Sequence, residues 1–95
     1  MLSDHTVLLP TSGNLSSDLD DETVVLDADK GVYYGMNPVA AFIWHQISSP
    51  TTVGDVKQAV MDEFDVDEET CDRDLQNLLS NLLTAGLIEV RRDAA

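Results

Sequence analysis

Basic residues are scarce in this chain: five lysines and arginines stand against 18 aspartates and glutamates, giving a net charge of −13 at neutral pH. A field of this sign repels phosphate backbones and anionic lipid headgroups, which argues against nucleic acid and membrane surfaces as partners. It favours basic peptides and basic protein patches instead. Residues 51–90 carry most of the charge, with ten acidic residues against Lys57 and Arg73.

Cysteine, histidine and long apolar runs are also nearly missing. The single cysteine, Cys71, cannot form an internal disulfide, and one cysteine with two histidines is too few for a structural zinc site. No apolar stretch approaches the ~20 residues that span a bilayer, and the N-terminus has no basic segment typical of a signal peptide. The sequence predicts a cytoplasmic protein with neither a metal nor another cofactor.

The 95 residues are enough for one domain with one modest core, and 43% of them are hydrophobic, which is too many for a disordered chain. We therefore expect a single domain over residues 1–95. Residues 1–22 are predicted to form a short strand and an acidic loop, and residues 91–95 a tail.

Three short segments have the composition of β-strands. His5–Leu9 ends at Pro10, Thr23–Leu26 is rich in β-branched residues, and Val32–Tyr34 follows a turn in which Gly31 takes a positive φ. The last two are expected to form a hairpin, and residues 11–22, rich in Ser, Asp, Gly and Asn, a loop. Together the strands predict a small three-stranded antiparallel sheet at the N-terminal end.

Three helices are expected to follow the sheet. Asn37-Pro38 starts the first, Thr52 caps the second, and Asp67 caps a third that Gly86 ends. Leu87–Val90 could return as a final short strand. The predicted fold class is α+β with a winged helix-turn-helix architecture.

Three local motifs resemble a calcium-binding loop, a carrier-protein serine motif and a catalytic cysteine, but their spacing or position in the predicted fold argues against each function. Counted from Asp27, Gly31 is at position five and Pro38 at position twelve, whereas an EF-hand needs Gly at six and Glu at twelve. The segment 16–19 resembles the serine motif of acidic carrier proteins, but with the order of residues reversed and in a predicted loop. Cys71 lies in the apolar stripe of the third helix, where cysteine usually acts as a small hydrophobe and not as a nucleophile. We therefore predict no catalytic residue.

DNA binding is the function that a winged helix suggests first. The third helix would read the bases, but five acidic residues against Arg73 give its N-terminal half a charge of −4. A DNA-binding protein or an acidic interaction regulator remains the alternative hypothesis.

Peptide binding fits the composition better. An edge strand leaves amides and carbonyls unpaired, and an extended peptide could add along Val32, Tyr33, Tyr34, Gly35 and Met36, with side chains in a groove against the third helix. Adjacent tyrosines point to opposite faces, so one could pack inward while the other lines a surface. The alternative is that both simply cover the helices.

Eight short motifs follow one another along the chain: Leu26-Asp27, Gly31–Tyr34, Met36-Asn37, Ile43-Trp44, Thr52-Val53, Phe64–Asp67, Cys71 with Asp74, and Leu82–Leu87. In this order and spacing they resemble the PqqD-type proteins, the recognition elements that bind leaders of ribosomally synthesised peptide precursors. The resemblance covers roughly residues 23–90, and Met36 stands where Leu is usual. The Cys-x-x-Asp pattern of the third helix is most similar to the freestanding leader-binding half of a split lasso-peptide leader peptidase.

The resemblance implies a non-catalytic protein that binds the leader by strand addition and presents the precursor to a separate peptidase subunit and a macrolactam synthetase. A homodimer through the same strand edge is also possible. On the third helix we expect Cys71, Leu75 and Leu78 to contact apolar leader side chains. One of Asp67, Asp72 and Asp74 would meet a leader lysine or tyrosine hydroxyl. Leu75 could instead belong purely to the core.

Overall fold

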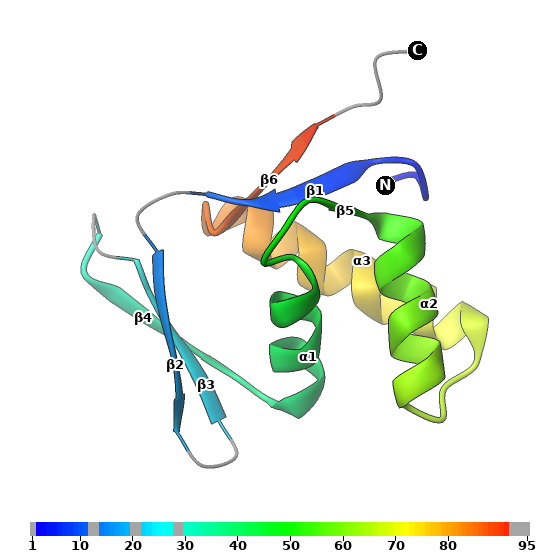
Figure 1. The fold of residues 1–95 in the computed structure, drawn as a ribbon, viewed down its shortest axis with the longest axis horizontal. Helices are drawn as coiled ribbons and strands as arrows, with labels where there is room; N and C mark the ends of the chain where they lie inside the picture. Colours follow the sequence, from blue (N-terminus) through cyan, green and yellow to red (C-terminus); the bar gives the residue numbers. More distant parts are fainter. Residues whose placement is uncertain (1, 12–13, 20–21, 28–29, 92–95) are drawn as a thin grey trace.

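The computed structural model describes residues 2–11, 14–19, 22–27 and 30–91. They form an α+β winged helix-turn-helix, as the sequence predicts, in which one small sheet lies beside the first helix and a second runs across the three helices (Figure 1). No helix in these ranges is long and apolar enough to cross a membrane. The elements are β1 (Val7–Pro10), β2 (Asn14–Leu19), β3 (Glu22–Asp27), β4 (Val32–Met36), α1 (Pro38–Gln46), β5 (Thr51–Thr52), α2 (Val53–Glu63), α3 (Glu68–Thr84) and β6 (Ile88–Arg91).

The helices begin at the three capping residues that the sequence predicts. In each case a side-chain oxygen accepts a hydrogen bond from an amide of the first turn, which otherwise lacks a partner. The bonds run from Ala40 N to Asn37 Oδ1 (2.8 Å), from Asp55 N to Thr52 Oγ1 (3.1 Å) and from Thr70 N to Asp67 Oδ1 (2.7 Å). The expected end of α3 is also confirmed, because Gly86 follows it with a φ of 75°.

The expected three-stranded sheet exists, but its strands differ from the prediction. Residues 11–22 do not form only a loop, because β2 lies within them and pairs with β3. The order is β2-β3-β4, and we call this sheet the wing. The predicted hairpin of β3 and β4 is confirmed, with Val25 opposite Tyr34, and Gly31 has a φ of 67°. Residues 28 and 29, on which the expected turn type depends, lie outside the described ranges.

The first predicted strand belongs to a second sheet. β1 pairs on one side with β5, which the sequence did not suggest, and on the other with β6, so that the order is β5-β1-β6. The predicted final strand is confirmed and runs to Arg91, the first residue of the expected tail; the rest of that tail lies outside the described residues. Leu8 of β1 is fully buried and belongs to the same hydrophobic core as the three helices, so this sheet packs over them.

Candidate functional site

The edge of β4 away from β3 is open within the described part of the chain, because β4 is the last strand of the wing. Tyr33 is 70% exposed, whereas Tyr34 is half-buried and packs against the core. The two tyrosines therefore point to opposite faces, and the expectation that both cover the helices is wrong. Met36 is buried, so only its backbone could take part in an edge interaction.

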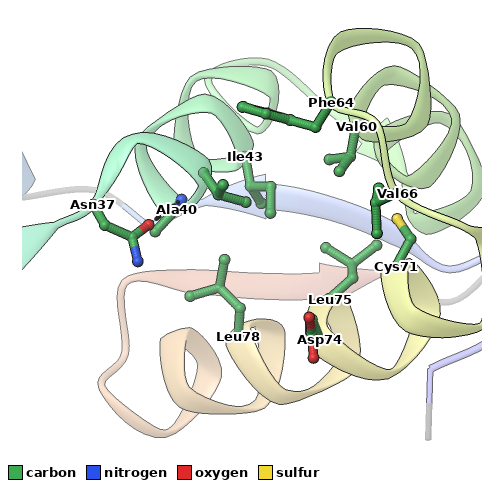
Figure 2. A pocket seen from close by; sticks show the side chains of 11 residues that line it. Asn37, Ala40, Ile43, Val60, Phe64, Val66, Cys71, Asp74, Leu75 and Leu78 are labelled. Carbon is green, nitrogen blue, oxygen red and sulfur yellow. Dashed lines mark hydrogen bonds between the residues drawn. The ribbon is translucent and has the colours of Figure 1, made fainter.

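An apolar pocket with a volume of about 370 Å³ lies between the three helices, and β4 leads directly into it (Figure 2). Asn37, the residue after β4, lines its entrance and also caps α1. Apart from Asn37 and Asp74, the lining is apolar. The lining residues are Asn37, Val39, Ala40, Ile43, Val60, Phe64, Val66, Cys71, Asp74, Leu75 and Leu78.

Helix α3 supplies one wall of the pocket from four residues that the sequence singled out. Cys71, Asp74, Leu75 and Leu78 follow the spacing i, i+3, i+4 and i+7, which places them on one face of the helix. Leu75 is only 2% exposed and belongs to the core as well as to the wall, whereas Leu78 is half-buried. The Asp74 side chain is 67% exposed and lies 3.6 Å from Arg73 Nε at the rim.

Asp67 and Asp72 are not among the residues that line this pocket. The Asp67 carboxylate caps α3, and its hydrogen bonds with Thr70 hold the pKa of this carboxyl below its ordinary value. Asp72 lies 3.8 Å from Lys57 Nζ, on another side of α3. Of the three acidic residues proposed for leader contacts, the structure therefore brings only Asp74 to the pocket.

Replacing Asp67 with alanine should lower the urea midpoint at pH 7, because α3 loses its N-terminal acceptor. The carboxyl has a folded-state pKa below its ordinary value of 3.8, so its contribution is present above that pH and is lost as the pH falls through the folded-state pKa. The difference between wild type and Asp67→Ala should therefore shrink steadily below pH 3.8. This difference in urea midpoint is measured at each pH by urea titration, with circular dichroism as the signal for unfolding. Asp65→Ala removes the same charge from the preceding turn, and a pH-independent difference at Asp67 would contradict the capping role.

Burial raises the pKa of the Cys71 thiol, so the sulfur is protonated at neutral pH. Its S–H donates to the backbone oxygen of Lys57 at 3.8 Å, a contact that joins α3 to α2. Cys71 is therefore a buried, protonated residue in the apolar wall of the pocket. The described residues also contain no group of three or more His, Cys, Asp or Glu side chains that could hold a metal ion.

The sequence did not identify the walls that α1 and α2 contribute. From the sequence, Ala40 and Ile43 belong to a broad apolar face of the first helix, and Phe64 to the apolar stripe of the second helix and the turn after it, which is the pattern of core residues. Phe64 is held in place by an edge-to-face contact with Phe42, with ring centroids 5.4 Å apart. Val39, on the same apolar face of α1, is exposed and lines the pocket, so the structure leaves this face partly uncovered.

Comparison with known proteins extends these observations. The model of the PqqD family, described as coenzyme PQQ synthesis protein D, matches residues 22–88. The structure is similar to that of TbiB1 in complex with the TbiA(beta) leader peptide, with a TM-score of 0.81 and 29% identity over 90% of this chain and 99% of that one. For lasso peptide synthetase B1 complexed with the leader peptide, the TM-score is 0.77 at 24% identity, over 86% and 96% of the two chains. The search of curated proteins found no match.

Proposed function

The chain belongs to the PqqD family, and on that premise we propose that it binds the leader of a ribosomally synthesised peptide precursor, of the lasso class, as an added strand on β4. The observation that carries the proposal is the open edge of β4, which runs straight into an apolar pocket. TbiB1, which has the same fold and nearly the same length, is a protein whose structure contains a leader peptide.

The two halves of the site supply different parts of the interaction. Strand addition along Val32–Met36 satisfies backbone amides and carbonyls and depends little on sequence. The pocket supplies selectivity, because burying an apolar side chain against Cys71, Leu75 and Leu78 removes its surface from water. Asp74 at the rim can pair with a leader lysine or accept a hydrogen bond from a tyrosine hydroxyl.

Charge is the second line of support. With a net charge of −13, the protein attracts a basic leader over a distance and raises the association rate. The same charge disfavours DNA binding, since the N-cap Asp67 and the first-turn residues Glu68 and Glu69 are exposed at the start of α3, where a reading helix meets phosphates. Binding of DNA by the winged helix is the competing function.

The role that we propose is delivery without catalysis. The bound precursor would be presented to a separate leader peptidase subunit and then to a macrolactam synthetase. The buried, hydrogen-bonded thiol of Cys71 supports this, because the one cysteine of the chain serves packing.

A fluorescence-anisotropy titration tests the proposal. The probe is a synthetic, fluorescein-labelled peptide with the leader sequence of the precursor encoded beside the gene for this protein. Saturable binding below about 10 μM, with no binding of a scrambled peptide of the same composition, is the expected result. A 20-base-pair DNA duplex serves as the competing probe. Tighter binding of the duplex than of the leader would overturn the proposal.

Replacing Asp74 with asparagine should slow leader association by about two- to fivefold at low salt, because the variant removes a rim charge beside the pocket. At high salt the two association rates should converge, since ions screen the lost attraction. Stopped-flow mixing with the labelled leader measures the rate. Glu89→Gln removes one charge from β6 in the other sheet, and an equal effect there would show that only the total charge matters.

A further inference from the structure

Residues 2–6, here called the strap, cross from α3 to α2 with a turn at Asp4 and His5, in which Thr6 N donates to the Ser3 carbonyl at 3.1 Å. Leu2 is held by its backbone: its N–H donates to Gln76 Oε1 at 3.0 Å, and Gln76 Nε2 donates to the Leu2 carbonyl at 2.9 Å. At the other end, Val53 N donates to the Thr6 carbonyl at 3.0 Å. The strap therefore contacts the middle of α3 and the first turn of α2 at once. It precedes residues 22–88, which the family model matches.

Lys57 and Gly54 of α2 make further contacts with the strap, and we call the contacts of the strap with α2 and α3 the joint. Lys57 Nζ lies 3.2 Å from Asp4 Oδ1 and 3.8 Å from Asp72 Oδ1, so one ammonium group links the strap, α2 and α3. Its side chain is only 12% exposed, which limits screening by solvent. Gly54 N donates to the Asp4 carbonyl at 3.0 Å, and a β-carbon at Gly54 would lie 3.2 Å from that oxygen.

The helices that the strap joins are two of those that build the pocket. Asp72 and Gln76, four residues apart, lie on one side of α3, whereas Asp74 and Leu78 lie towards the pocket. Lys57 is one turn before Val60, a pocket residue, and its carbonyl accepts from the Cys71 thiol. A shift of α3 relative to α2 would therefore change both the joint and the pocket.

An unfilled apolar pocket tends to close, because protein interiors are close-packed and the walls gain contacts by moving together. We propose that the strap is a positioning element that fixes the spacing of α2 and α3 through Lys57 and Gln76, and so holds the pocket open for an apolar side chain of the leader. This inference rests on the proposed function. Neither residue lines the pocket, so their effect on binding is indirect. Preformed walls reduce the cost of ordering the site on binding.

The test combines protein variants with two forms of the labelled leader: the full sequence, and a form in which the apolar residues that contribute most to affinity are replaced by alanine. Gln76→Leu keeps the side-chain volume but loses both bonds to Leu2. It should bind the full leader about five- to tenfold more weakly and the alanine form with unchanged affinity. Gln58→Leu is the matched control, because Gln58 bonds only to Asp62 within α2.

Gly54→Ala is a second variant, and we expect it to be at least as stable as wild type. Alanine favours the helix over glycine, but its β-carbon pushes against the strap at Asp4. We expect an unchanged or higher urea midpoint together with weaker binding of the full leader only. Lys57→Arg should bind like wild type, whereas Lys57→Met should behave like Gln76→Leu.

The outcomes separate the two proposals. If wild type binds no leader, the proposed function is wrong. Two results would show that the strap does not position the pocket, provided that wild type binds the leader. In the first, Gln76→Leu and Gly54→Ala bind both leader forms as tightly as wild type does. In the second, the two variants lose the same factor of affinity for the full leader and for the alanine form.

Discussion

Replacing Leu78 with aspartate should weaken leader binding by about 30- to 1,000-fold, or roughly 2–4 kcal/mol. Leu78 lies on the pocket wall formed by α3 and is half-buried, so the new carboxylate would lose water when an apolar leader side chain fills the pocket. In the free protein the same carboxylate can stay hydrated, and α3 should remain folded. Anisotropy titration with the labelled leader measures the loss, and far-UV circular dichroism confirms the fold.

Ser80→Asp is the matched control for this variant. It adds the same charge to the same helix at an exposed position, and we expect less than a twofold change in affinity. If Leu78→Asp is folded and binds the leader like wild type, the pocket is not part of the leader site. If Ser80→Asp weakens binding as much as Leu78→Asp does, the loss reflects total charge rather than the pocket.

Leu75 gives a less informative variant, although the sequence suggested it first. Its side chain is 2% exposed and packs in the core, so Leu75→Asp would bury an unpaired charge even without a leader. We expect this variant to unfold the domain. Spacing along α3 placed Leu75 and Leu78 on one face, but only packing distinguishes the residue that supports the pocket from the one that opens onto it.

The features predicted correctly are those that local sequence determines. Asn37, Thr52 and Asp67 each cap the helix that follows, Gly31 has the positive φ expected of it, and Gly86 follows the end of α3 as predicted. A cap or a turn depends on a few neighbouring residues, so it can be recognised without knowing the rest of the fold.

The errors arise where distant segments meet. Residues 14–19 contain Asn, Ser and Asp, which disfavour strands, but pairing with β3 makes them β2. β1 was placed in the wrong sheet because its partners, β5 and β6, are more than 40 residues away in sequence. The pocket was only half identified for the same reason: α3 presents a regular stripe, whereas the walls from α1 and α2 exist only once the three helices pack.

A proline on the open edge of β4 should weaken leader binding by about 2 kcal/mol or more, roughly 30-fold, because it removes an amide from the added strand's ladder. Successive residues of a strand direct their amides to opposite sides, so of Tyr33 and Tyr34 one faces β3 and the other the open edge. Tyr33→Pro and Tyr34→Pro are therefore made as a pair. The proline that replaces the amide facing β3 should lower the stability of the protein. The proline that replaces the amide at the open edge should leave the fold intact and weaken leader binding. Urea titration and anisotropy are measured on both.

The alanine variants separate backbone from side-chain effects. Tyr33 is largely exposed, so Tyr33→Ala should cost little stability, whereas Tyr34→Ala removes a side chain that packs against the core. Both should bind the leader with only modestly reduced affinity, because strand addition uses the backbone. Strand addition at β4 would be wrong if the stably folded proline variant of the pair bound the leader as tightly as its alanine counterpart. The leader would then be held by the pocket alone, and Leu78→Asp would abolish binding while neither proline affected it.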